Sequence, residues 1–166
     1  MRGYTIDVKK EKKITKAYGK EYPISPKKAY EVCNKLRGMP YNDAKMLLEG
    51  VINKKIAIPI RRYNQETAHK KGVGPGRYPV KVAKYILKLF KNLESNAKED
   101  GIDLENAYIY VIAASRGRIK KWRMPRAYGI STAWNEQTTN IEVILKERKE
   151  KKASENKVSE NKVSGA

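Results

Sequence analysis

Six cationic side chains and three aromatic rings lie between Ala114 and Trp134, with no carboxylate among them. Cationic groups bind phosphate, arginine with two parallel hydrogen bonds, and aromatic rings stack on unpaired bases. These residue types therefore predict contact with RNA. The alternative is a disordered basic loop with no particular partner. The candidate RNA-binding residues here are Arg116, Arg118, Lys120, Lys121, Trp122, Arg123, Arg126, Tyr128 and Trp134.

A second basic segment, residues 54–78, mixes its charges with prolines and glycines. We interpret it as a long flexible loop that fits against a folded RNA backbone, because long loops in compact domains are usually functional or disordered. A merely solvated loop is the alternative. Its candidate RNA-binding residues are Arg61, Arg62, His69, Lys70, Lys71, Arg77 and Tyr78.

Groups that could catalyse a reaction are scarce. His69 is the only histidine, and its neighbours Lys70 and Lys71 provide no carboxylate to orient it, so we expect an RNA contact or an idle imidazole. The glycine-rich stretch Gly72 to Arg77 lacks the Lys-Ser/Thr pair of a nucleotide P-loop. Helix-end and turn chemistry explains the remaining acidic group, Asp100, Asp103 and Glu105, better than a metal site. We expect no catalytic residue, metal or cofactor.

The charge balance of the chain also indicates a nucleic-acid partner. Lys and Arg number 37 and Asp and Glu 18, giving a formal net charge of +19. This excess is beyond what solubility requires and predicts a polyanionic partner, nucleic acid first. No stretch approaches the roughly 18 apolar residues of a spanning helix, and the first residues lack a signal peptide's apolar run. We expect a cytoplasmic protein without a membrane partner.

Helical periodicity predicts the elements that carry these segments. Ser25 followed by Pro26 is a typical helix start, and Gly38 and Pro40 are a typical end. The single cysteine, Cys33, lies in the apolar row of this helix, so we expect a small buried side chain. A second helix is predicted from about Asn42, and a third from Pro79 to about Asp100 with exposed lysines. The apolar rows are Ala29, Val32, Cys33 and Leu36 in the first helix, and Ala44, Leu47, Leu48 and Val51 in the second.

Three segments have the composition of strands: Thr15–Ile24, Ala107–Ala114 and Thr138–Glu147. The last two are separated by far more than the usual hairpin loop, so we predict that they continue outward as a protruding ribbon with its turn near Pro125 to Gly129. Arg116, Arg118 and Lys120 are then expected on one face of the arm. The residues therefore predict helices and strands in one domain, with a long β-hairpin at residues 115–137.

The final segment, residues 148–166, repeats Ser-Glu-Asn-Lys-Val and is charged and polar. Such a composition does not bury a core face, so we predict a disordered tail with no assigned role. The expected organisation is one RNA-binding domain, residues 1–147, followed by this tail.

Several motifs together resemble the family of large-subunit ribosomal protein twenty-two in its archaeal and eukaryotic form. The likeness covers roughly residues 12 to 147. The most specific motif is Pro-Arg-Ala-x-Gly, Pro125 to Gly129, in the middle of a long basic hairpin. The others are Ser25-Pro26-Lys27-Lys28, Leu36-Arg37-Gly38, GPGRYPVKVAKYILKLFKN from Gly74 to Asn92, and Ala133-Trp134-Asn135.

The resemblance implies the fold class α+β, three helices packed on a three-stranded antiparallel sheet with the long protruding β-hairpin. It also implies a protein of the large ribosomal subunit whose partners are rRNA, neighbouring ribosomal proteins and the nascent peptide. Family members send the hairpin inward to line the peptide exit tunnel, where this chain has Ile130 after the glycine in place of the family's common basic residue. By position, the tunnel-facing tip would comprise Arg123, Met124, Arg126, Tyr128 and Gly129.

Two other functional classes are a free-standing nucleic-acid-binding regulator and a nucleic-acid-processing enzyme. A free-standing RNA- or DNA-binding regulator would need a helix that presents Asn, Gln or Arg to bases, whereas the third helix presents lysines. A nucleic-acid-processing enzyme would need carboxylate pairs for metal, and the basic segments have none. Both are less consistent with the residues than a structural rRNA-binding protein.

Overall fold

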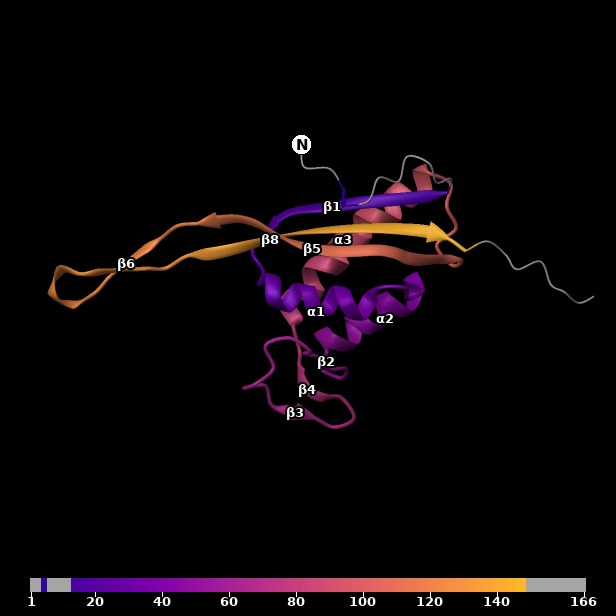
Figure 1. Ribbon diagram of the computed structural model, residues 1–166. Helices are drawn as coiled ribbons and strands as arrows, with labels where there is room; N and C mark the ends of the chain where they lie inside the picture. The colour runs from indigo at the N-terminus through magenta and orange to yellow at the C-terminus, as the bar shows by residue number, and fades with distance from the viewer. Residues whose placement is uncertain (1–3, 6–12, 149–166) are drawn as a thin grey trace, which may run out of the picture.

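The computed structural model describes residues 4–5 and 13–148. These residues form helices on an antiparallel three-stranded sheet in the order β1-β8-β5, which confirms the predicted α+β class (Figure 1). The predicted tail lies outside the described residues from residue 149 onward. The main elements are α1 (Pro26–Leu36), α2 (Tyr41–Ile52), α3 (Val80–Glu99), β1 (Ile14–Tyr22), β5 (Ala107–Lys120) and β8 (Glu136–Glu147).

The helix boundaries follow the local signals in the sequence. Helix α1 begins directly after Ser25 with Pro26 in its first turn. An N–H group at this position has no acceptor within the helix, so proline, which lacks the N–H, costs the helix no hydrogen bond. At its other end Arg37 N donates to Cys33 O at 3.1 Å. Gly38 then takes a φ of 78°, a left-handed conformation that glycine adopts without strain.

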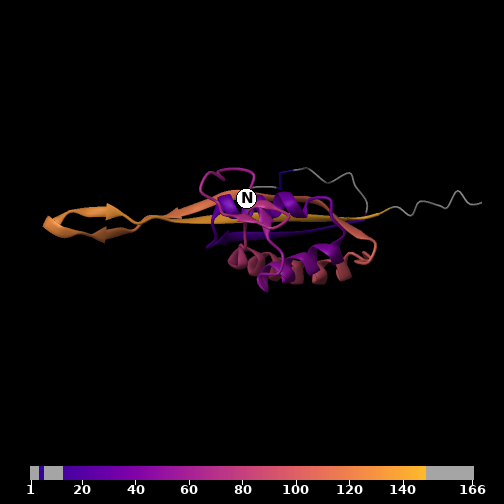
Figure 2. The same ribbon diagram turned by 90° about the horizontal axis from the view of Figure 1, so that it is seen from below.

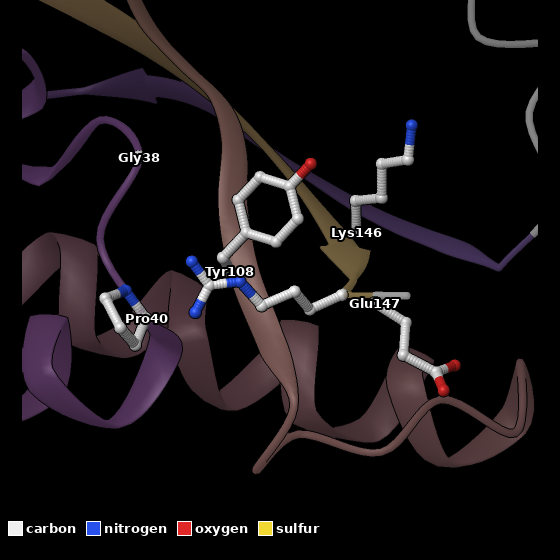
Figure 3. A pocket seen from close by; sticks show the side chains of 6 residues that line it. Gly38, Pro40, Tyr108, Lys146 and Glu147 are labelled. Carbon is white, nitrogen blue, oxygen red and sulfur yellow. The ribbon is translucent and has the colours of Figure 1, made fainter. Parts of the chain in front are cut away.

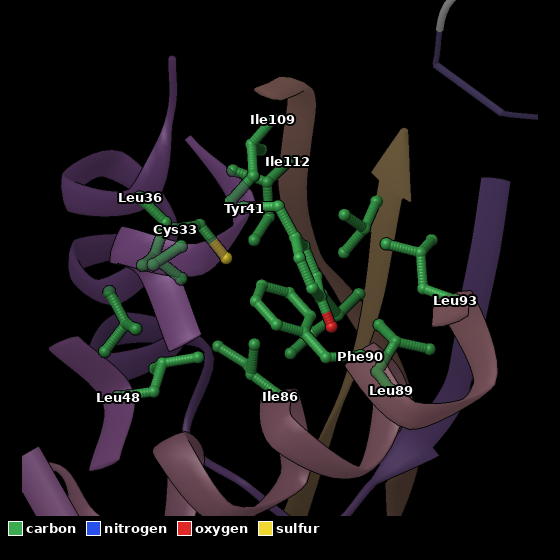
Figure 4. Close-up of a cluster of buried hydrophobic side chains, with 14 of the residues drawn as sticks. Cys33, Leu36, Tyr41, Leu48, Ile86, Leu89, Phe90, Leu93, Ile109 and Ile112 are labelled. Atoms are coloured by element: carbon green, nitrogen blue, oxygen red, sulfur yellow. The ribbon is translucent and has the colours of Figure 1, made fainter. Parts of the chain in front are cut away.

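One face of each helix packs against one face of the sheet (Figure 4). Cys33 is buried in this core, as predicted, and burial raises the pKa of its thiol to about 12. The Tyr41 and Phe90 rings lie 5.3 Å apart between α2 and α3. Large buried side chains that meet here include Leu36, Leu48, Ile86, Leu89, Leu93, Ile109 and Ile112.

Strand β8 is the central strand and is buried on both faces from Thr138 to Leu145. Its alternate residues Ile141, Val143 and Leu145 join the helix-facing core. On the opposite face Glu142 lies across from Tyr18, and its Oε2 accepts a hydrogen bond from Thr5 N at 3.0 Å. Tyr4 and Thr5 therefore help to cover the face that the helices leave open.

Strands β5 and β8 remain paired beyond the body, as far as Lys120 opposite Glu136. The short strands β6 (Arg123–Pro125) and β7 (Ser131–Ala133) then pair with each other, and the 3₁₀ turn η1 (Ala127–Gly129) closes the end. Figures 1 and 2 show this two-stranded hairpin, residues 115–137, projecting away from the helices and the sheet.

A β-bulge at the base of the hairpin corrects one sequence prediction. The register shifts between Arg116, opposite Thr139, and Ile119, opposite Gln137, so two residues of β5 face one of β8. Arg116 lines a pocket beside α1, whereas Arg118 lines a pocket with Tyr4 and Tyr18 on the other side of the sheet. The expectation that Arg116, Arg118 and Lys120 share one face is wrong because the bulge interrupts the alternation.

The basic segment 54–78 is also more ordered than predicted. It contains a small antiparallel sheet in the order β2-β4-β3, with β2 at Ile58–Pro59, β3 at His69–Lys70 and β4 at Gly74–Arg77. Ile58 and Ile60 are buried, and Ile60 N donates to Pro75 O at 2.9 Å. Ile58 belongs to the hydrophobic core and ties the segment to it, so the segment is not an irregular loop throughout.

Candidate nucleic-acid interface

The cationic side chains predicted along the hairpin are all exposed: Arg116, Arg118, Lys120, Lys121, Arg123 and Arg126. Lys120 Nζ lies 3.6 Å from Glu136 Oε2, and both side chains are about half exposed. The other five have no carboxylate partner among the residues that the structure describes. Their charge is therefore available to an external anion.

The tip of the hairpin is held by its own hydrogen bonds. Arg126 N donates to Ile130 O at 2.7 Å, and Ile130 N donates to Ala127 O at 3.3 Å. Tyr128 and Gly129 have φ values of 60° and 68°, which turn the chain sharply and leave the Tyr128 side chain 99% exposed. An aromatic ring presented in this way is suited to contact with a partner surface.

Two arginine side chains of the tip lie against the opposite arm. Arg123 Nη1 donates to Ser131 Oγ at 3.0 Å, and Arg126 Nε donates to Thr132 Oγ1 at 3.2 Å. Each guanidinium keeps further N–H groups for a ligand. Met124, the remaining predicted tip residue, is half-buried.

Trp122 and Trp134 face the solvent between the part of the hairpin formed by β5 and β8 and the part formed by β6 and β7. Trp134 N donates to Trp122 O at 2.7 Å, so the two backbones are joined although the indoles are mostly exposed. Exposed indoles are unusual unless they contact a partner, and bases are suitable stacking partners for them.

The small sheet carries the second predicted group. Arg61, His69, Lys71 and Arg77 are exposed, and Lys70 Nζ lies 5.7 Å from the centroid of the Tyr78 ring. Figure 1 shows this small sheet and the hairpin on different sides of the body, so the two groups do not form one patch. Arg62 is the exception, because it lines the same pocket as Arg116.

That pocket also contains residues that sequence analysis did not identify: Lys27, Tyr30, Glu31 and Tyr63. Tyr30 is an exposed aromatic residue outside the apolar row of α1, and Tyr63 directly follows Arg62. The sequence signal that could have identified Tyr63 as a site residue is its position next to Arg62, a predicted RNA-binding arginine.

A further pocket of about 580 Å³ lies at the end of the sheet opposite the hairpin (Figure 3). Gly38, Pro40, Tyr108 and Lys146 line it together with Glu147 and Arg148. Glu147 Oε1 accepts from Lys13 Nζ at 2.8 Å, and Lys146 Nζ lies 5.0 Å from the Tyr110 ring centroid. These contacts hold the strand ends together beside the pocket.

The predicted acidic group forms a turn. Asp103 Oδ1 accepts from Glu105 N at 3.0 Å and its Oδ2 accepts from Asn106 Nδ2 at 2.8 Å. Within residues 4–5 and 13–148, no three His, Cys, Asp or Glu side chains gather in a way that could hold a metal ion. No helix in the same ranges is long and apolar enough to cross a membrane.

An α+β body that exposes a cationic hairpin and a cationic small sheet has the features of a structural nucleic-acid-binding protein. The chain belongs to the family described as ribosomal protein L22p/L17e, which it matches over residues 17–146.

Its relatives include archaeal proteins named large ribosomal subunit protein uL22. That of Archaeoglobus fulgidus is 42% identical over 148 residues, which cover 87% of this chain and 96% of the relative. That of Sulfurisphaera tokodaii is 43% identical over 156 residues, covering 89% and 99%. That of Ignicoccus hospitalis is 44% identical over 153 residues, covering 87% and 96%.

These matches confirm the resemblance found in the sequence and its archaeal type. The protein is a structural component of the large ribosomal subunit in the cytoplasm, with rRNA and ribosomal proteins as partners, and it is not an enzyme.

Proposed function

We propose that the protein braces large-subunit rRNA by bridging several rRNA domains, and that its hairpin forms part of the wall of the nascent-peptide exit tunnel. The observation that carries this proposal is the projecting hairpin, whose cations lie exposed and largely without carboxylate partners. The described body, residues 13–147, acts as one rRNA-binding unit from which the hairpin and the basic segment 54–78 extend.

Isolated two-stranded hairpins are marginally stable in water, and the six cations that lie close together between Arg116 and Arg126 repel one another. RNA removes both problems, because phosphates neutralise the arginines and bases stack on the exposed indoles. The hairpin is thus suited to insertion between folded RNA segments. The arm contacts are assigned to Arg116, Arg118, Lys120, Lys121, Trp122, Arg126 and Trp134.

The small sheet provides a second attachment on another side of the body. Its exposed cations Arg61, Lys71 and Arg77 are assigned to phosphate contacts. Attachment at two separated places is what a protein needs to hold rRNA domains in fixed relation. The contacts assigned here are Arg61, Arg62, His69, Lys70, Lys71, Arg77 and Tyr78.

The tip is assigned to the tunnel wall and to contact with the nascent peptide. Tyr128 presents its ring to the solvent, while Arg123 and Arg126 lie along the opposite arm and leave the end of the hairpin narrow. Ile130, which is exposed, makes the wall apolar beside Gly129. The proposed tip therefore comprises Arg123, Met124, Arg126, Tyr128 and Gly129.

Removing residues Lys121 to Ile130 tests the tunnel assignment. The shortened chain is expected to fold, because the deleted residues lie outside the hydrophobic core. Ribosomes that carry it are expected to lose cross-links between this protein and a stalled nascent peptide. A photoreactive amino acid at Tyr128 in the full chain should give that cross-link, and one at Met46, exposed on α2, should not. Cross-linking from Met46 but not from Tyr128 contradicts the tunnel role.

A further inference from the structure

A small pocket lies between α1, the start of the basic segment and the base of the hairpin. Its volume is about 170 Å³, below the roughly 300 to 1,000 Å³ of sites for drug-sized ligands, so it suits one planar group. Three elements far apart in the sequence provide its lining, which includes Lys27, Tyr30, Glu31, Arg62, Tyr63 and Arg116.

Cations and aromatic rings alternate around this pocket. The Arg62 guanidinium carbon lies 5.2 Å from the Tyr30 ring centroid and 5.7 Å from that of Tyr63, and Lys27 Nζ lies 4.5 Å from the Tyr63 centroid. Tyr30 is 40% exposed and Tyr63 is 70% exposed, so both keep free ring surface. Rings and guanidinium planes of this kind stack on nucleobases.

Glu31 is the unexpected member of this group. It is only 4% exposed, yet it forms no ion pair with any described residue, although three cationic side chains line the same pocket. One oxygen, Oε1, accepts a hydrogen bond from Arg62 N at 2.8 Å. A carboxylate has about four lone-pair sites, so most of its accepting capacity is unused. The described side-chain oxygens that are buried without a partner are Thr15 Oγ1, Thr67 Oγ1 and Glu142 Oε1, so Glu31 Oε2 is open to solvent and can accept from a ligand.

A carboxylate on a surface that binds RNA repels phosphate, so its partner must be a donor, either a ribose 2′-hydroxyl or a group on a base. The tyrosine rings that line the same pocket favour a base. Guanine is the base whose Watson–Crick edge presents two adjacent donors, N1–H and the N2 amino group. Adenine and cytosine each place one amino donor beside an acceptor, and uracil places one N–H between two acceptors. A carboxylate with two oxygens therefore pairs in a bidentate manner with guanine alone.

We propose that this pocket binds a single unpaired guanine of rRNA. The base stacks on the tyrosine rings, its N1–H and N2–H groups donate to Glu31, and Arg116 and Lys27 bind the flanking phosphates. This inference rests on the proposed function, because it names a base-specific site within the proposed rRNA interface.

Short oligouridines with one central guanosine, adenosine or inosine test the proposal with the full chain. Affinity measured by fluorescence anisotropy is expected to be about 10- to 100-fold higher for guanosine than for adenosine or for uridine alone, the range for a bidentate base contact. Inosine lacks the N2 amino group and should fall between them. Equal affinities, or no binding to any of these RNAs, overturn the proposal.

The Glu31→Gln variant assigns the preference to this side chain. Its amide oxygen can still accept from Arg62 N, so the fold is retained, but the second acceptor becomes a donor. We expect the guanosine preference to disappear while the affinity for plain oligouridine stays the same or rises. Glu105→Gln, an exposed acid in the turn before β5, should keep the preference. A preference that persists in Glu31→Gln overturns the assignment.

Tyr63→Phe and Tyr63→Ala separate stacking from folding. The phenylalanine variant should bind guanosine RNA like the parent chain, and the alanine variant should lose affinity about tenfold. Co-sedimentation of each variant with the large subunit is measured in parallel. A chain that sediments normally but lacks base preference refutes only the guanine site, whereas a parent chain that does not sediment refutes the proposed function.

Discussion

Glu94 connects α3 to α2 at the edge of the core. Its Oε1 accepts from Lys45 Nζ at 2.9 Å and from Tyr41 Oη at 2.7 Å. The hydrogen bond from Lys45, followed by that from Tyr41, lowers the pKa of this carboxyl. On the other side of the pair, burial raises the pKa of the Tyr41 hydroxyl, and the bond to Glu94 adds to the effect.

This pair predicts how stability depends on pH. Because the folded pKa of Glu94 lies below its unfolded value of about 4.3, the carboxylate stabilises the fold above that value, and this contribution is lost as the pH falls through the folded pKa. Glu94→Gln should therefore lower the free energy of unfolding at pH 7 by about 1 kcal/mol or less, because the pair is partly exposed to solvent. Urea denaturation at several pH values measures this difference.

The difference between parent and variant should shrink toward pH 3. Glu99→Gln, at an exposed position near the end of the same helix, is the control and should show no such change. A difference that is equally large at pH 7 and pH 3 would show that the ionised form of Glu94 is not what stabilises the pair.

At the scale of single residues, the sequence predicts the burial of a side chain where one local pattern determines it. Cys33 was predicted to be buried from its place in an apolar row, and it is. Glu31 follows no such rule: it is a charged residue next to Val32 in the same helix, yet it is buried, and its carboxylate accepts from Arg62 N, thirty-one positions away along the chain. Contacts between distant segments decide its environment, and one sequence does not reveal them.

At the scale of elements, the hairpin and the sheet from which it grows should differ in dynamics. The amides of β8 from Thr138 to Leu145 are buried on both faces, whereas residues 119 to 135 form a ribbon open to solvent. Hydrogen exchange of the free chain should be slow in the first segment and at least tenfold faster in the second, since local opening there breaks few apolar contacts. Mass spectrometry of peptides from each segment measures the two exchange rates separately.

Adding large-subunit rRNA should slow exchange in residues 119 to 135 and leave β8 unchanged. Strong protection of the tip in the RNA-free chain would mean that the hairpin is stabilised by the protein itself. That result would remove the argument that RNA holds it.

The elements with strong periodicity were predicted nearly to the residue. Helix α1 starts at Pro26 and α3 ends at Glu99, as the proline and glycine signals indicate. The bulge was missed, although a glycine inside a strand pattern is a known signal for one. At Gly117 a Cβ atom would overlap Thr138 Oγ1, so this position has no room for a side chain. The small sheet was missed because its strands contain two to four residues, too few for a pattern.

For the whole molecule, the formal charge of +19 should make RNA binding strongly dependent on salt. Replacing both Arg116 and Arg118 with glutamine should flatten the slope of log K against log salt by about 1.5, since each phosphate contact contributes about 0.7 to 0.9. The matched control is the double variant Lys35→Gln with Lys98→Gln, two exposed cations on α1 and α3 outside the assigned contacts, which should change the slope less. An unchanged slope in the double variant would show that the base of the arm does not bind phosphate.

The net charge and the sequence motifs gave different information about the class of protein. Composition alone predicts a polyanionic partner, and only the motifs from Ser25 to Asn135 pointed to a ribosomal family. The arrangement of the two cationic regions on different sides of the body was not predictable, because it depends on how α1 and the small sheet pack.

The order of strands also governs when the protein can fold. Strand β8 lies between β1 and β5, yet it is synthesised after both. Until translation has passed residue 147, the two outer strands have no partner between them, and a chain interrupted earlier keeps two unpaired edges with a tendency to aggregate. Completion of the sheet is thus delayed until nearly all of the described chain has been made, and assembly onto RNA through the finished hairpin cannot begin sooner.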